Sequence, residues 1–130
     1  MKILIVEDEQ KTGDYLKQGL SEAGFVADLA RDGVDGLHLA LTDDYDLMVL
    51  DVMLPVVDGF EVCRQLRADP AHAGLKILLL TARGRAAEIE RGIRLGADLY
   101  MTKPFATRDL VATVRQLLAA GTAGPSAVTG

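Results

Sequence analysis

The sequence has little of several features that mark whole classes of protein. It contains one cysteine and no tryptophan among 130 residues, and its apolar runs are only a few residues long. The single cysteine, Cys63, excludes an internal disulfide and a cysteine-paired metal site, and we interpret it as a buried apolar residue on a helix. Apolar runs this short predict that no helix crosses a membrane.

Basic residues neither outnumber the acidic ones nor gather in a cluster. There are 14 Lys and Arg against 19 Asp and Glu, for a net charge of −5. Because affinity for nucleic acids comes largely from clustered Lys and Arg, we expect no direct nucleic-acid binding by this chain. Met1-Lys2 leads directly into an apolar run, with no leader or cleavage site before it, which favours a cytoplasmic location.

Motifs that hold a nucleotide or position a serine nucleophile are also missing. The sequence has no GxxxxGK[ST] loop, no GxGxxG after its first apolar run and no GxSxG motif. The chain therefore lacks the usual devices of nucleotide-binding proteins and of serine hydrolases.

Apolar runs alternate with helical patterns along the chain. Runs of β-branched and large apolar residues predict strands over residues 2–6, 25–30, 47–50, 76–80 and 98–101. Apolar residues at helical spacing predict helices over residues 11–23, 60–68 and 86–95. Two further helices are predicted, one that begins after a cap at Asp32 and a last one that begins at a cap at Thr107. On the helix after Asp32, the spacing predicts a buried face made by Val34, Leu37 and Leu41.

Strands that alternate with helices predict an α/β protein with a parallel sheet covered on both faces. We expect a flavodoxin-like (βα)5 three-layer sandwich with strand order 2-1-3-4-5, because the first and third strands, which are the most apolar, are then central. One hundred and thirty residues fit a single domain, which we place at 1–119. Residues 120–130 carry no charge and are rich in small residues, which predicts a flexible tail or the start of a linker.

Four of the predicted strands end near side chains that can take part in chemistry: Asp8, Asp51, Thr81 and Lys103. The carboxyl ends of parallel strands meet at one edge of the sheet, where ligands bind in open α/β folds. Taken alone, each residue has an ordinary structural explanation. Asp8 could cap a helix, Thr81 could be a plain strand residue, and Lys103 could be a surface lysine. Their coincidence at strand ends favours one shared site.

Carboxylates crowded at one edge repel one another unless a cation joins them. Oxygen ligands of this kind suit Mg²⁺, and Mn²⁺ is the alternative. The expected ligands are Asp8 and Asp51 directly, Glu7 through water, and the backbone carbonyl of Met53.

A carboxylate with a metal ion and a lysine beside it can form an aspartyl phosphate. A carboxylate of this group would be the nucleophile, the metal and Lys103 would neutralise the phosphoryl oxygens, and Thr81 would donate its hydroxyl. Because the nucleotide-binding motifs are missing, we expect the phosphoryl donor to be small or to be another protein.

Four motifs around these residues, IVEDE, LDVMLPVVDG, LLLTA and GADLYMTKPF, resemble those of the receiver (CheY-like) domains of two-component response regulators. The resemblance covers about residues 1 to 118. It implies that Asp51 accepts a phosphoryl group from a histidine kinase or histidine phosphotransfer protein, and that Glu7 and Asp8 form the metal pocket. Thr81 and Lys103 would bind the phosphoryl group, and the bond from Lys103 to Pro104 would be cis.

The same resemblance implies how phosphorylation would change partner binding. Thr81 and Tyr100 would act as a switch that reshapes the face made by the fourth helix, fifth strand and fifth helix, where an output partner or a second copy would bind. No catalysis beyond self-catalysed phosphotransfer and autodephosphorylation is expected. One alternative is an Mg²⁺-dependent phosphohydrolase that uses an aspartyl phosphate, although Met53 stands where such enzymes usually carry a second acid.

The first sixty residues most resemble receivers of winged-helix (OmpR/PhoB-like) transcription factors, especially metal- and copper-responsive ones. That class usually has Asp-Asp before the switch aromatic and an arginine in the fourth helix, where this chain has Asp98-Leu99 and Ile89. An apolar docking patch at Leu99 and Ile89 is therefore the alternative to a charge-paired dimer. The chain would be either a stand-alone regulator or the receiver of a longer DNA-binding regulator.

Overall fold

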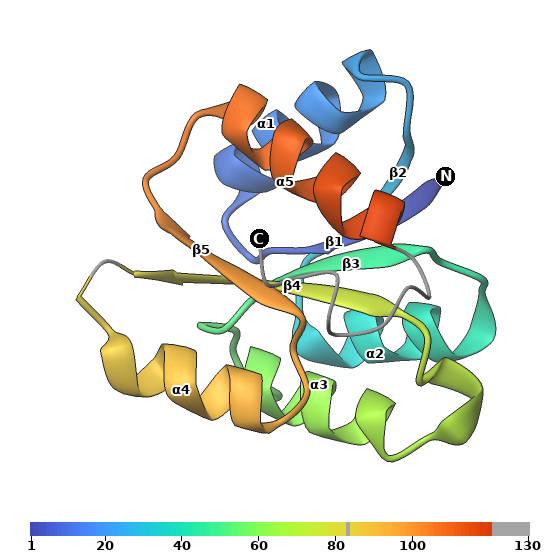
Figure 1. The fold of residues 1–130 in the computed structure, drawn as a ribbon, viewed down its shortest axis with the longest axis vertical. Helices are drawn as coiled ribbons and strands as arrows, with labels where there is room; N and C mark the ends of the chain where they lie inside the picture. Colours follow the sequence, from blue (N-terminus) through green and yellow to red (C-terminus); the bar gives the residue numbers. More distant parts are fainter. Residues whose placement is uncertain (83, 121–130) are drawn as a thin grey trace.

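The computed structural model describes residues 1–82 and 84–120, and over these ranges five strands alternate with five α-helices (Figure 1). The strands are β1 (Lys2–Val6), β2 (Val26–Ala30), β3 (Leu47–Asp51), β4 (Lys76–Ala82) and β5 (Leu99–Lys103). The helices are α1 (Gln10–Glu22), α2 (Gly33–Thr42), α3 (Gly59–Arg67), α4 (Ala86–Arg94) and α5 (Thr107–Ala120), with a short 3₁₀ turn η1 (Pro70–His72) before β4.

The strands form one parallel sheet in the order β2-β1-β3-β4-β5. Helices α1 and α5 cover one face of the sheet, and α2, α3 and α4 cover the other (Figure 1). The predicted flavodoxin-like three-layer sandwich and its strand order are therefore confirmed. The predicted tail begins at residue 120, the last residue of α5, and its remaining residues lie outside the described part of the chain.

The central strands are buried on both faces, which explains why their sequences are continuously apolar. In β1, Ile3 and Ile5 pack with α1 and α5, whereas Leu4 and Val6 pack with the helices of the opposite face. The same alternation holds along β3, all five residues of which are buried. Two separate cores thus sandwich the sheet and fix the position of its carboxyl edge.

The predicted buried face of α2 is wrong at two of its three positions, because Val34 and Leu41 are 52% and 42% exposed. The buried positions are instead occupied by small residues, among them Gly36 and Ala40. A Cβ atom added at Gly36 would lie 2.7 Å from Cγ2 of Val6. The helix therefore approaches β1 through its small residues. Val34 and Leu41 are turned toward solvent, and Leu37 and Leu39 pack partly against the core.

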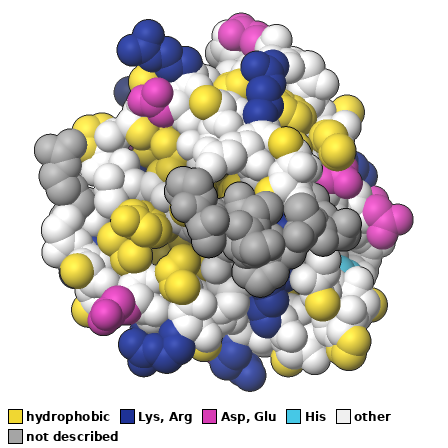
Figure 2. All heavy atoms as spheres, viewed as in Figure 1, with side chains coloured by type: hydrophobic (Ala, Val, Ile, Leu, Met, Phe, Trp, Pro, Cys, Tyr) yellow, Lys and Arg dark blue, Asp and Glu magenta, His cyan; other side chains and the backbone are white. Residues whose placement is uncertain are grey.

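None of the helices in the described residues is both long enough and apolar enough to cross a bilayer. On the face that Figure 2 shows, Lys and Arg side chains lie in separate groups near the edges of the molecule, with acidic and hydrophobic side chains between them. This distribution agrees with the mixed charge pattern of the sequence.

Candidate functional site

The carboxyl ends of β1, β3, β4 and β5 lie at one edge of the sheet, as predicted. The register pairs Val6 with Leu50, Asp51 with Leu80, and Ala82 with Lys103. The acids after β1, the acid that ends β3 and the lysine that ends β5 are thereby brought to the same edge, although they lie far apart in the sequence.

Glu7, Asp8 and Asp51 form a carboxylate cluster in which one oxygen of each lies within 4.8 Å of the others. Glu7 and Asp51 are buried, whereas Asp8 is exposed to solvent. The pKa of Glu7 is raised to about 7, mainly by burial and also by the nearby Asp51, while the hydrogen bond from Lys103 acts in the opposite direction. Two buried acids this close need a positive partner.

Lys103 is that partner. Its Nζ donates hydrogen bonds of 2.7 Å to Oε1 of Glu7 and of 2.7 Å to Oδ2 of Asp51. Burial acts to lower the pKa of Lys103, but the hydrogen bonds to Asp51 and Glu7 outweigh it and the pKa is raised. The ammonium group therefore stays charged and links the two carboxylates. The peptide bond from Lys103 to Pro104 is cis, as the family resemblance implied.

The cluster suits a hard divalent cation. Its three acids supply oxygen ligands, and the exposed side of Asp8 leaves room for the waters that Mg²⁺ retains. The backbone of Met53 lies beside the cluster, because its N–H donates to Oδ1 of Asp51 at 2.9 Å. Residues of the predicted metal site are thus brought together in the structure.

Thr81 is buried near the end of β4, but its hydroxyl is not directed at a carboxylate of the cluster. Its Oγ1 donates to Oε1 of Glu88, in the first turn of α4, at 2.8 Å. Glu88 is not among the residues that the sequence predicted for the site. No local signal identifies it, because periodicity does not show how the first turn of a helix meets the strand before it.

The sequence model of the family described as the response regulator receiver domain matches residues 3–115. The chain belongs to this receiver family. The receiver resembles CusR of Escherichia coli (strain K12), a transcriptional regulatory protein, with 57% identity over 123 residues that cover 95% of this chain and 53% of CusR. PcoR of Escherichia coli, also a transcriptional regulatory protein, is 51% identical over 117 residues, 90% of this chain and 51% of PcoR.

Solved structures agree with this assignment. The receiver domain of the Francisella response regulator 1452 matches with a TM-score of 0.84 and 30% identity, over 91% of this chain and 96% of that one. The receiver spans about half the length of the curated relatives named above. The predicted resemblance to receivers of transcription regulators is confirmed, and the chain is a receiver of a two-component response regulator.

The predicted switch aromatic of the receiver, Tyr100, lies on β5 and is 40% exposed. It pairs in register with Leu79 of β4, two residues before Thr81. The two positions of the predicted apolar patch, Leu99 and Ile89, are each half-buried. On the predicted output face, Tyr100 is therefore partly exposed, whereas Leu99 packs partly against the core beneath α1 and α5.

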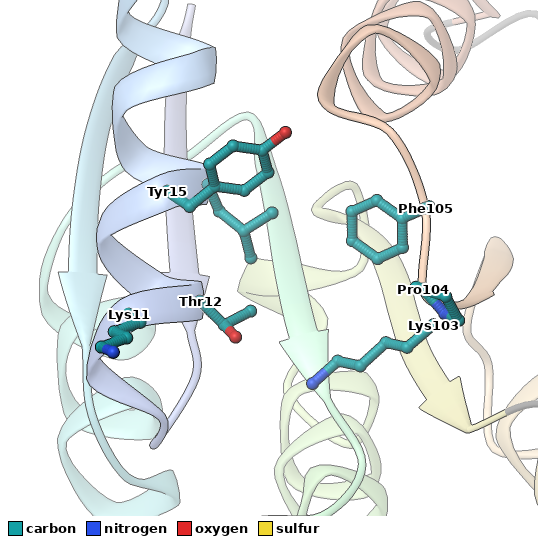
Figure 3. Close-up of a pocket in the computed structure, with 7 residues that line it drawn as sticks. Lys11, Thr12, Tyr15, Lys103, Pro104 and Phe105 are labelled. Atoms are coloured by element: carbon teal, nitrogen blue, oxygen red, sulfur yellow. The ribbon is translucent and has the colours of Figure 1, made fainter.

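A groove of about 440 Å³ lies beside Lys103, between α1 and the segment that joins β5 to α5 (Figure 3). In Figure 3, the rings of Tyr15 and Phe105 stand on its opposite sides. Its lining residues are Lys11, Thr12, Tyr15, Leu16, Lys103, Pro104 and Phe105. The sequence reasoning did not predict this groove, whose two walls come from opposite ends of the chain.

Proposed function

We propose that the receiver accepts a phosphoryl group on Asp51 from a histidine kinase or a histidine phosphotransfer protein. The observation that carries this proposal is the bridging of Glu7 and Asp51 by Lys103 at the carboxyl end of the sheet. Asp51 is a buried carboxylate next to a fixed ammonium group and further acids, and these are the groups that the formation of an aspartyl phosphate requires. A purely structural role for this arrangement is harder to explain.

In the transfer step, a carboxylate oxygen of Asp51 forms a bond to phosphorus while the bond from phosphorus to the donor's imidazole nitrogen breaks. The imidazole leaves with the electron pair of that bond. Lys103 neutralises charge on the phosphoryl oxygens, and its position next to Asp51 requires little rearrangement. Asp8 and Asp51, Glu7 through water and the Met53 carbonyl would hold Mg²⁺, which supplies further charge neutralisation when bound.

Phosphorylation adds negative charge and new acceptor oxygens beside Asp51. In the proposed response, the Thr81 hydroxyl donates to one of these oxygens, and Tyr100 turns from its half-exposed position toward the space that Thr81 vacates. The shape of the face made by α4, β5 and α5 then changes, and with it the affinity for an output partner or a second copy of the chain.

The groove beside Lys103 is the surface we assign to the phosphodonor protein. It adjoins the residue that contacts Asp51, and its wall carries Tyr15, which is 55% exposed. An apolar side chain of the donor seated between Tyr15 and Phe105 would place the donor histidine near the carboxyl edge of the sheet.

The relatives favour one particular setting for this function. They are named as transcriptional regulators and are about twice the length of this chain. We therefore favour the receiver of a DNA-binding regulator over a stand-alone regulator. A phosphohydrolase is disfavoured, because the position two residues after Asp51 holds the exposed and uncharged side chain of Met53.

The proposal is tested by incubating the protein with Mg²⁺ and acetyl phosphate and measuring its intact mass. A phosphoryl adduct is expected on the wild type and on Asp44→Asn, a control at the opposite edge of the sheet, and not on Asp51→Asn. No adduct on a folded wild type, or an adduct retained by Asp51→Asn, would overturn the assignment. Turnover of ordinary phosphate monoesters would favour the phosphohydrolase instead.

A further inference from the structure

The hydroxyl of Thr81 already donates a hydrogen bond, and its acceptor lies on a different element from Asp51. Thr81 is almost fully buried in β4, and its Oγ1 donates to Oε1 of Glu88 at 2.8 Å. The other carboxylate oxygen of Glu88, Oε2, lies 3.7 Å from Nη1 of Arg85. Glu88 is thus held between the strand that carries Thr81 and the residue before α4.

A threonine hydroxyl has one proton to donate. The Glu88 carboxylate and a phosphoryl group on Asp51 are both hydrogen-bond acceptors, so Thr81 cannot donate its proton to both at once. A bond to one acceptor is therefore made at the expense of a bond to the other.

We propose that Glu88 is a positioning residue that holds the Thr81 hydroxyl away from Asp51 until phosphorylation. This inference rests on the proposed phosphorylation of Asp51. When the phosphoryl group takes the hydroxyl, Glu88 loses its bond to β4, and the first turn of α4 is released at the same moment. The exchange ties the occupancy of the site to the position of α4.

The packing of α4 makes this bond important for the helix. Gly92 is its one buried residue, and the larger Ile93 is 45% exposed. A Cβ added at Gly92 would overlap Cδ1 of Leu79, so this small residue lies in close contact with the sheet. With so little buried apolar surface, one hydrogen bond at the first turn is a substantial part of what positions α4.

Removal of the acceptor should favour the phosphorylated arrangement. We expect Glu88→Ala to bind beryllofluoride, a phosphoryl mimic, about fivefold more tightly in the presence of Mg²⁺, which corresponds to the net value of one hydrogen bond, about 1 kcal/mol. Glu88→Leu, a second variant without the acceptor, should show the same gain. Glu88→Gln keeps a carbonyl acceptor at the same place and should restore affinity close to that of the wild type.

Two controls separate the hydrogen bond from a general effect of charge. Glu90→Ala removes the same charge from an exposed position of α4 and should leave the affinity unchanged. In a Thr81→Val background, which has no hydroxyl to share, Glu88→Ala should have no further effect, so the two substitutions should be non-additive in a double-mutant cycle.

Beryllofluoride affinity is measured by calorimetry on each variant of the 130-residue chain, with thermal unfolding as the check of folding. An equal gain for Glu88→Gln and Glu88→Ala, or an undiminished gain in the Thr81→Val background, would overturn the role of Glu88. Wild-type affinity in both Glu88→Ala and Glu88→Leu would also overturn it. If the wild type itself does not bind beryllofluoride, or if Asp51→Asn binds it as well, then the proposed phosphorylation site fails instead.

Discussion

Val56 has an unusual backbone conformation in the loop between β3 and α3. Its φ is 67°, and the N–H of Val57 donates to the carbonyl of Pro55 at 2.8 Å, which makes Val56 the centre of a γ-turn. A β-branched residue in the left-handed region costs roughly 1–2 kcal/mol, because its Cβ crowds the following carbonyl. The side chain is 94% exposed, so burial does not offset this cost.

Replacing Val56 with glycine should therefore stabilise the fold. Glycine adopts a positive φ without strain, although its freedom in the unfolded chain acts in the other direction by about 0.4–1 kcal/mol. We expect Val56→Gly to raise the free energy of unfolding by about 0.5–1 kcal/mol, measured by urea denaturation. The control Val57→Gly removes a side chain that packs on the core and should lower the free energy of unfolding. A less stable Val56→Gly would show that the loop is not strained.

Cys63 is fully buried on α3, in agreement with the sequence-based interpretation, and its Sγ lies 3.7 Å from the carbonyl oxygen of Leu95. Burial raises the pKa of the Cys63 thiol, with the charge of Arg67 acting against it. We expect no reaction with Ellman's reagent at pH 8 in the native state and complete reaction in denaturant. Rapid labelling without denaturant would mean that α3 opens locally.

At the scale of the elements, the start of α3 packs against the end of β3 without room for a side chain. The Asp58 side chain caps the helix by accepting from the N–H of Glu61 at 2.9 Å. The N–H of Gly59 donates to the carbonyl of Val52 at 3.2 Å. A Cβ at Gly59 would overlap the carbonyl oxygen of Asp51 and lie 2.8 Å from Cα of Val52. This contact places α3 directly behind the proposed phosphoacceptor.

Gly59→Ala should accordingly destabilise the protein, although alanine is the better helix former by about 1 kcal/mol. Because the overlap is with backbone atoms, we expect a loss of about 1–3 kcal/mol in the free energy of unfolding and weaker beryllofluoride binding. Gly74→Ala, where a Cβ meets nothing within 4 Å, is the matched control and should be neutral in both measurements. Unchanged binding by Gly59→Ala would show that Asp51 tolerates a shift of α3.

For the whole molecule, the carboxylate cluster links metal binding to stability. A cation that binds the native cluster and not the unfolded chain stabilises the fold by mass action. At a Mg²⁺ concentration tenfold above its dissociation constant, the ion should raise the free energy of unfolding by about 1.4 kcal/mol and the melting temperature by a few degrees. Asp8→Asn should abolish this gain, and Asp44→Asn should retain it. An equal Mg²⁺ response in Asp8→Asn would place the ion elsewhere.

The sequence by itself determined the alternation of strands and helices, the order of the sheet and the edge at which Asp8, Asp51 and Lys103 meet. These features could be predicted because they depend on local patterns. A strand buried on both faces must be apolar throughout, as β3 is, and the residue that ends it must lie at the sheet edge. The motifs around the site then identified the family.

Only the tertiary structure decided how the elements contact one another. Val34 and Leu41 have helical spacing, yet Gly36 is buried in their place, because the distance between α2 and β1 is set by the packing of both. Periodicity cannot report that distance. Glu88 likewise is a charged residue of the kind usually found on a protein surface. Its hydrogen bond to Thr81 exists because β4 and α4 meet at that point. Partners of this kind are selected by three-dimensional proximity, which no local pattern contains.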